Sequence, residues 1–270
     1  MNNLSELCPA HDLGPLRDII DLQACPIDDP GFRNRCRQTL EQTGALVLTG
    51  FMKPAAVELV RQEGLAKQHL AYYTAKQHNV YLSESDPAFA GDHPRNASVT
   101  SSKGCITDDI VAQDSPLRTL YNAGVFRDFL GEVLEETLYE YADPLSSINL
   151  HYASEGQELG WHFDNSSFAT TLLIQKPAGG GVFEYVENLR DADNGDMNYD
   201  GVGRVLAGKV TPKQLSMEPG ALVLFRGRNA LHRVTPTEGD ITRMLVVLAY
   251  NNQPGVALSE NARMTFYGRL

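Results

Sequence analysis

The sequence predicts an α+β fold in which N-terminal helices pack against a C-terminal β domain of the sandwich, barrel or jelly-roll type. From about residue 146, short β-rich runs follow one another, separated by turn signals such as Glu155-Gly156 and Pro219-Gly220. Before residue 141, longer stretches carry apolar residues at helical spacing. Many short strands in series are typical of closed or sandwiched β architectures.

The N-terminal elements are expected in the following order. The first thirty residues form an irregular lead-in interrupted by four prolines, and 31–43 form a helix that ends near Gly44. Residues 45–51 (ALVLTGF) are short, apolar and bounded by glycine, which predicts a buried strand. Residues 54–78 have apolar positions near helical spacing and are expected to form one long amphipathic helix.

The next two segments differ sharply in composition. Residues 83–115 are polar and rich in turn formers, which predicts a long, lid-like loop. Residues 115–141 are expected to be helical, with one apolar side formed by Phe126, Phe129, Leu130, Val133 and Leu134.

We therefore expect one domain over 1–270. Residues 1–140 form its mainly helical part, and 141–270 form the β core with an acidic insert at 187–215. The insert lacks the regular aspartate spacing of a calcium loop, so a solvated loop is the expectation.

Composition narrows the function classes. The formal net charge is −11 and the basic residues are scattered, which disfavours nucleic acid as a partner. No apolar run reaches about 18 residues, so no membrane span is expected. No signal peptide is evident, and the four cysteines lack C-x-x-C spacing, which favours reduced thiols in a cytoplasmic protein. The sequence does not indicate an oligomeric state.

A candidate metal centre begins at Trp161-His162-Phe163-Asp164. Positions i and i+2 of a strand face the same way, so His162 and Asp164 can point together into a barrel mouth. His232 begins another β-like run and supplies a third ligand. Two histidines and one carboxylate form the facial triad that leaves three positions open on iron(II).

Those open positions suit a 2-oxo acid, which takes two of them, and O₂, which takes the third. Arg243 stands eleven positions after His232, at the start of an apolar strand. A buried arginine needs an anionic partner, and a carboxylate can bind its guanidinium with two hydrogen bonds. An H-x-D motif alone is common, but its combination with a distal histidine and a following arginine is specific. Among the other polar candidates, Asn149 could hydrogen-bond the 2-oxo acid and Arg95 could hold a substrate carboxylate.

These motifs resemble the iron(II)- and 2-oxoglutarate-dependent oxygenase superfamily, whose fold is a double-stranded β-helix, a distorted jelly roll. Several segments over most of residues 90–270 also resemble the BesD-like free-amino-acid halogenases and their sister lysine hydroxylases. The segments are DSPLRTLY (114–121), YADPLSSINL (141–150), ELGWHFDNSSF (158–168), GGVFEYV (180–186), PGALVLFRGRNALHRVTP (219–236) and YGRL (267–270). The resemblance implies Fe(II), 2-oxoglutarate and O₂ as cofactors and cosubstrates.

Position 164 separates the two activities within that group. The halogenases carry a small residue there, which frees a site for chloride, whereas this chain keeps Asp164. The resemblance therefore implies hydroxylation of an amino-acid-like small molecule. Asn165 and Tyr267 stand where the group has an acidic residue and a tryptophan, and both are expected to contact substrate.

Substitutions after the arginine argue against lysine as the substrate. The group is expected to carry Asn and Thr four and six places after Arg243, where this chain has Val247 and Ala249. Two alternatives to hydroxylation remain. The same site could desaturate or cyclise a small molecule, or the chain could be a non-catalytic module that binds a metal.

Overall fold

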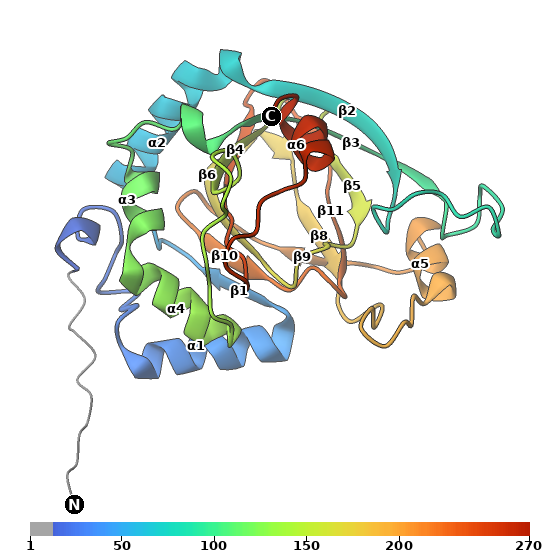
Figure 1. Cartoon of the computed structure of the whole chain (residues 1–270), viewed down its shortest axis with the longest axis horizontal. Helices are drawn as coiled ribbons and strands as arrows, with labels where there is room; N and C mark the ends of the chain where they lie inside the picture. The colour runs from blue at the N-terminus through green and yellow to red at the C-terminus, as the bar shows by residue number, and fades with distance from the viewer. Residues whose placement is uncertain (1–12) are drawn as a thin grey trace, which may run out of the picture.

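The computed structural model describes residues 13–270, and its central feature is a curled antiparallel sheet (Figure 1). Neighbouring strands follow the order β1-β10-β6-β13-β4-β3-β5-β11-β8-β9, with β2 paired to β3. The strands are β1 (Ala45–Leu48), β2 (Tyr72–Asn79), β3 (Ser98–Ile106), β4 (Ile148–Ala153), β5 (Leu159–His162), β6 (Ala169–Gln175), β8 (Phe183–Val186), β9 (Lys213–Leu215), β10 (Leu222–Phe225), β11 (Leu231–Val234) and β13 (Arg243–Leu248). A separate ribbon pairs β7 (Gly179–Gly180) with β12 (Thr237–Glu238).

The helices within residues 30–134 cover one face of this sheet (Figure 1). The α-helices are α1 (Pro30–Thr43), α2 (Pro54–Lys67), α3 (Pro116–Asn122), α4 (Gly124–Leu134), α5 (Tyr199–Leu206) and α6 (Glu260–Tyr267). Three short 3₁₀ turns are η1 (Gly14–Leu16), η2 (Gln68–Leu70) and η3 (Asp108–Ile110). The α1–α4 layer shares the largest apolar core with alternate residues of β4, β6, β10 and β13, and its burial stabilises the scaffold.

Successive side chains along each strand point to opposite faces of the sheet. On β13, Met244, Val246 and Leu248 are fully buried against the helices. The intervening residues Arg243 and Leu245 point to the inside of the curl. One strand therefore supplies both the packing face of the scaffold and a wall of the interior.

The two ends of the sheet meet and close the curl. Phe225 of β10 and Phe183 of β8 are far apart in strand order, yet their ring centroids lie 4.9 Å apart. Both belong to a second core that also contains Ala45 of β1 and Leu215 of β9. This closed, curled sheet confirms the predicted double-stranded β-helix with helices packed on it.

Sequence signals explain the ends of α1, which was predicted at 31–43. Asp29 accepts a hydrogen bond from the Phe32 backbone N–H, and Pro30 occupies the first helical turn. Gly44 ends the helix in the left-handed conformation at φ 68°. The helical prediction for 115–141 is confirmed for α3 and α4, although residues 135–141 leave the helix.

Two predictions about the N-terminal half are wrong. The helix expected over 54–78 ends at Lys67, and after η2 the chain turns into β2, which pairs with β3 over its whole length. The lid-like loop expected over 83–115 is a loop only up to residue 97, because Ser98–Ile106 form β3 between β4 and β5. The part at 1–140 thus supplies three strands to the sheet as well as helices.

The insert at 187–215 contains turns, α5 and the edge strand β9. Cys25, Cys36 and Cys105 are free and buried, and Cys8 lies outside the described residues. Over residues 13–270, no helix combines the length and apolarity that crossing a membrane requires.

Candidate metal centre

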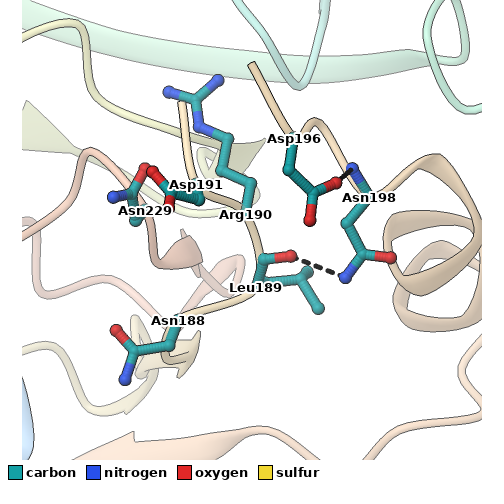
Figure 2. Close-up of a pocket in the computed structure, with 7 residues that line it drawn as sticks. All are labelled: Asn188, Leu189, Arg190, Asp191, Asp196, Asn198 and Asn229. Carbon is teal, nitrogen blue, oxygen red and sulfur yellow. Dashed lines mark hydrogen bonds between the residues drawn. The ribbon is translucent and has the colours of Figure 1, made fainter. Parts of the chain in front are cut away.

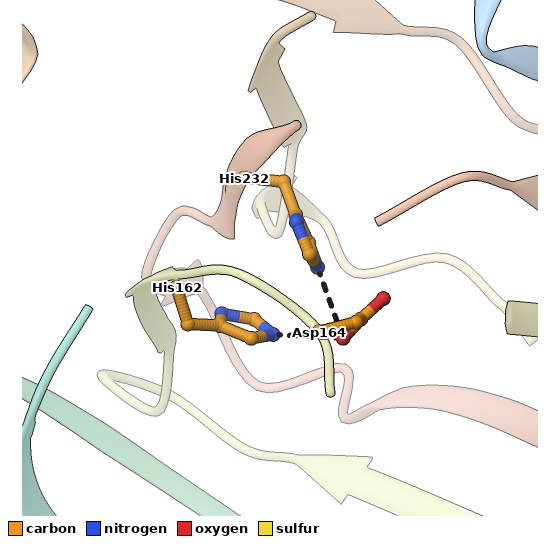
Figure 3. Close-up of side chains that lie close together, drawn as sticks. All are labelled: His162, Asp164 and His232. Carbon is orange, nitrogen blue, oxygen red and sulfur yellow. Dashed lines mark ion pairs between the residues drawn. The ribbon is translucent and has the colours of Figure 1, made fainter. Parts of the chain in front are cut away.

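His162 and His232 face each other across two paired strands. They are direct partners in the register of β5 and β11, and both side chains are buried. Their ring centroids lie 4.1 Å apart. Asp164 follows β5 by two residues and enters the same space, so the sequence-predicted trio meets at one point (Figure 3).

The donor atoms are spaced to share one cation. Asp164 Oδ1 lies 3.7 Å from His162 Nε2 and 3.5 Å from His232 Nε2. All three donor atoms lie within 4.8 Å of one another, and no other such group occurs among residues 13–270. Metal–ligand bonds of about 2.1 Å place neighbouring ligands of an octahedral ion roughly 3 Å apart, so small side-chain movements bring all three into contact with one ion.

Backbone carbonyls fix the tautomer of both imidazoles. His162 Nδ1 lies 2.8 Å from Gly160 O, and His232 Nδ1 lies 2.9 Å from Ala230 O. A carbonyl only accepts hydrogen bonds, so each Nδ1 carries the proton and donates it. Each Nε2 therefore presents its lone pair to the centre, as a metal ligand must.

The protonation states also suit a metal. Burial lowers the pKa of His162 to about 3, with His232 adding to the effect, so the ring is neutral near pH 7. Burial works against the ionised form of Asp164, but the neighbouring histidines and Lys103 outweigh it and lower the carboxyl pKa. A neutral His162 ring and an ionised Asp164 carboxylate are the forms in which these residues bind iron(II).

The carboxylate of Asp164 is confined by Gly227, in the turn between β10 and β11. The Asp164 N–H donates to Gly227 O at 3.1 Å, and a Cβ placed on Gly227 would lie only 1.8 Å from Asp164 Oδ2. Oδ2 is buried and has no hydrogen-bond partner among the described residues. An orphaned buried carboxylate oxygen is costly unless a cation satisfies it, which fits a metal at this point.

A second set of contacts supports His162. Ser101 Oγ accepts from the Gly160 N–H at 2.9 Å and lies 2.7 Å from His78 Nε2. The His78 ring meets the edge of His162 with centroids 6.4 Å apart. His78 carried no signal in the sequence, because its role depends on β2 pairing with β3.

Arg243 begins β13 and faces the inside of the curl. Its side chain is 6% exposed, and no hydrogen bond or ion pair to it occurs among residues 13–270. Burial lowers its pKa to about 10, which leaves the guanidinium charged at neutral pH. With no hydrogen-bond partner among residues 13–270, its N–H donors are free to bind an anion, which fits the predicted contact with a carboxylate of the 2-oxo acid.

Two basic residues inside the curled sheet were not predicted from the sequence as part of the site. Lys103 of β3 and His151 of β4 contact each other inside the curl, with Lys103 Nζ 3.2 Å from His151 Nδ1. The sequence marked neither residue as part of the site, and Lys103 lies in the segment that was expected to be a lid-like loop. The only available signal was a lone lysine in a polar stretch.

The predicted substrate residues are spread over three places. Arg95 lies in the 80–97 loop, where its guanidinium covers Tyr81 at 5.8 Å and its buried Nη1 has no partner among the described residues. Asn165 is exposed, and its backbone carbonyl accepts from Arg228. Tyr267 ends α6 and donates its hydroxyl to Asn149 Oδ1 at 2.9 Å.

Asn149 is engaged in structural hydrogen bonds. Its amide nitrogen donates to the backbone carbonyls of Leu145 and Ile148 at 2.8 and 2.9 Å. Its side chain thus bridges β4 and α6, and its contact with a 2-oxo acid stays a prediction.

Arg190 is a further residue that sequence reasoning did not find. Its guanidinium lies 4.1 Å from the Phe163 ring centroid and 5.8 Å from that of Tyr81, and Nη2 lies 3.4 Å from Asp164 O. The residue comes from the acidic insert but packs directly behind the metal-centre loop. The insert therefore has a structural link to the site.

The insert also forms an open pocket of about 350 Å³, separate from the histidines (Figure 2). Its polar groups bond among themselves. Asn198 Nδ2 donates to Leu189 O, the Asn198 N–H donates to Asp196 Oδ1, and Asn194 donates to Asp191.

Solved structures share this fold at low sequence identity. A 2OG-Fe(II) oxygenase family oxidoreductase from Burkholderia pseudomallei matches with 12% identity and a TM-score of 0.52, over 84% of this chain and 94% of that chain. A prolyl hydroxylase from Trichoplax adhaerens matches with 11% identity and a TM-score of 0.53, over 82% and 90% of the two chains. The α-ketoglutarate-dependent epimerase SnoN of nogalamycin biosynthesis matches with 12% identity and a TM-score of 0.57, over 83% and 82%. No curated protein matches significantly.

The chain thus has the fold of these iron(II)- and 2-oxoglutarate-dependent oxygenases, and its two-histidine, one-carboxylate centre is the donor set that suits that class. A family comparison narrows this further, since residues 29–264 match the family described as halogenase D. The chain belongs to the halogenase D family.

Proposed function

We propose that this protein hydroxylates an unactivated C–H bond of a free amino acid or a small amino-acid derivative. The observation that carries the proposal is Asp164, whose carboxylate stands within 3.7 Å of both histidine Nε2 atoms. A halogenase of this type needs an open place for a halide at this position. Here a carboxylate fills it, so hydroxyl transfer is favoured despite the family's name.

Each residue of the centre has a distinct role in this proposal. His162, Asp164 and His232 hold iron(II), and Arg243 binds the distal carboxylate of 2-oxoglutarate. The bound metal and cosubstrate supply O₂ activation, with 2-oxoglutarate converted to succinate and CO₂. The protein itself orients the ligands and keeps their protonation states fixed.

Water exclusion is a second contribution of the chain. The His232 ring packs between Phe225, at 4.9 Å between centroids, and Phe183, at 5.6 Å. These aromatic rings shield one side of the His232 ligand from water. A dry, rigid surround strengthens electrostatic interactions and limits side reactions of the oxidant.

The surroundings of the site favour a small substrate with limited positive charge. Leu245 and Val247 of β13 lie on the inner face with Arg243, where they present apolar surface. Arg95 offers an unpaired buried N–H near Tyr81, suited to a substrate carboxylate. A free α-amino acid with an apolar or neutral side chain matches this combination.

The decisive experiment is anaerobic reconstitution with iron(II), followed by a panel of free amino acids with 2-oxoglutarate and O₂. Succinate release identifies the substrate, and the product mass identifies the reaction. A gain of one oxygen supports hydroxylation, a loss of two hydrogens indicates desaturation or cyclisation, and a chlorinated product overturns the assignment of Asp164.

Matched variants test the ligand assignment. In chloride-free buffer, Asp164→Ala is expected to abolish succinate formation, because the carboxylate ligand is lost and no halide can replace it. Asp240→Ala removes an exposed aspartate in the turn before β13 and serves as the control. Undiminished turnover by Asp164→Ala would refute the role of Asp164. Failure of the wild type to bind 2-oxoglutarate would instead favour a non-catalytic metal-binding module.

A further inference from the structure

The interior of the curled sheet carries more hydrogen-bond donors than the described residues can satisfy. Arg243 has no hydrogen-bond partner among residues 13–270. Lys103 Nζ lies 3.2 and 3.4 Å from the two nitrogens of His151, and this is its only hydrogen-bonding contact in the same part of the chain. A neutral imidazole accepts one hydrogen bond, whereas an ammonium donates three. Donors of Lys103 therefore remain available to a ligand.

Strand register places Lys103 and Arg243 on the same surface. Cys105 of β3 is the partner of His151 on β4, and Arg243 of β13 is the partner of Ala153 on β4. Lys103 lies two residues before Cys105, and Ala153 lies two residues after His151, so each shares the face of its strand neighbour. Lys103 and Arg243 thus flank β4 from its two sides.

A small residue separates the two cations. Continuing the β3–β4 register by one step sets Lys103 beside Ala153, whose methyl group leaves room above β4. Adjacent strands are about 4.8 Å apart, so the two backbones stand roughly 10 Å from each other and their long side chains can reach one anion over Ala153. His151 lies two residues before Ala153 on the same face of β4 and orients the Lys103 ammonium.

The electrostatic relations agree with this arrangement. Burial lowers the pKa of His151 well below its usual value, with Lys103 and Arg243 adding to the effect, so the ring is neutral and can accept from Lys103. No carboxylate of the described residues forms an ion pair with Lys103 or Arg243. Asp164 acts on Lys103 electrostatically without forming an ion pair, so a bound anion would find both cations free to donate hydrogen bonds.

We propose that Lys103 is a second anchor for the distal carboxylate of the 2-oxo acid, acting with Arg243 as a two-cation clamp that His151 orients. The inference rests on the proposed function, since it concerns the cosubstrate of the same centre. It assigns to Lys103 the discrimination between 2-oxo acids that carry a second carboxylate and those that lack it. Arg243 alone would bind the carboxylate, and the clamp adds selectivity.

The test measures cosubstrate binding without turnover. Iron(II)-loaded protein is titrated anaerobically with 2-oxoglutarate and, separately, with 2-oxopentanoate, which has the same chain length but no distal carboxylate. Binding is followed by calorimetry and by the visible charge-transfer band. Lys103→Met is compared with the wild type and with Lys76→Met, which removes an exposed lysine from the neighbouring strand β2.

Lys103→Met is expected to raise the Kd for 2-oxoglutarate by roughly 10- to 100-fold, the usual effect of losing a charge-assisted hydrogen bond. The Kd for 2-oxopentanoate should change by less than about threefold, and Lys76→Met should leave both unchanged. Lys103→Arg should retain most of the affinity. Lys103→Gln keeps a polar side chain without the charge, and should give the same loss if Lys103→Met proves insoluble.

Three results would overturn the inference. An unchanged Kd for 2-oxoglutarate in both Lys103→Met and Lys103→Gln would exclude the contact. Equal weakening of both acids would place Lys103 at the iron-bound end instead. If the wild type binds no 2-oxoglutarate at all, the proposed function fails as well, and that outcome is recognised by the absence of the band before any substitution is made.

Discussion

Replacing Gly227 with alanine should damage the metal centre while leaving the fold intact. A Cβ at this position would lie 1.8 Å from Asp164 Oδ2 and 2.6 Å from its Cγ, whereas real Cβ contacts essentially never fall below 3.0 Å. The carboxylate must therefore move by about 1.2 Å. Metal sites tolerate deviations of only about 0.2 Å in ligand distance, so the displaced carboxylate can no longer complete the triad.

The expected loss is at least about tenfold in iron(II) affinity, since disturbing even an outer partner of a ligand costs 10- to 100-fold. The displaced group is the end of a flexible side chain, so the unfolding free energy of the metal-free protein should change by less than about 1 kcal/mol. Anaerobic iron(II) titration measures the first quantity and urea denaturation the second.

Gly91→Ala is the matched control, because its new Cβ meets nothing within 4 Å and its backbone does not need glycine. The reasoning is refuted if Gly227→Ala binds iron(II) within twofold of the wild type. Equal loss of affinity in both variants would show that the effect is unrelated to Asp164.

Three further predictions concern stability. Burial lowers the pKa of His162 from 6.5 to about 3, so between these values the unfolded chain binds a proton that the folded chain does not. The metal-free protein should therefore lose stability as the pH falls from about 6.5 towards 4. Thermal unfolding at several pH values measures this loss, which should be smaller in His162→Gln. Gly64→Ala would bring a Cβ within 2.4 Å of Met244 Sδ in the core and should cost about 1–3 kcal/mol in urea unfolding, and an unchanged midpoint would contradict this packing. Iron(II) at about 100 times its Kd should add roughly 2.7 kcal/mol to the stability of the wild type, and Asp164→Ala should lose most of this gain.

The metal triad could be predicted because its signals are local and chemically specific. His162 and Asp164 are two residues apart, a spacing that sets both on one side of an extended chain. Only His232 required an assumption about distant segments. Its β-like context sufficed, because the two histidine strands are direct neighbours in the sheet.

The two errors in the N-terminal half have a common physical cause. Residues Tyr72–Asn79 lie largely exposed on an edge strand, so no alternation of buried apolar residues marked them as β. Ser98–Ile106 line a polar interior on one face, which gave the strand the composition of a loop. Both segments are strands because they pair with each other and β3 also pairs with β4, and long-range pairing outweighs local propensity.

The sequence by itself determined the identity of the reactive groups: two imidazoles, a carboxylate at 164 rather than a small residue, and an arginine at the start of a buried strand. The chemical identity of these side chains does not depend on how the chain folds. Tertiary structure alone decided which distant residues surround them, including Gly227 against Asp164 and Lys103 beside His151. Such contacts arise from strand register and chain curvature across the whole sheet, and these depend on pairing energies that no short stretch of sequence contains.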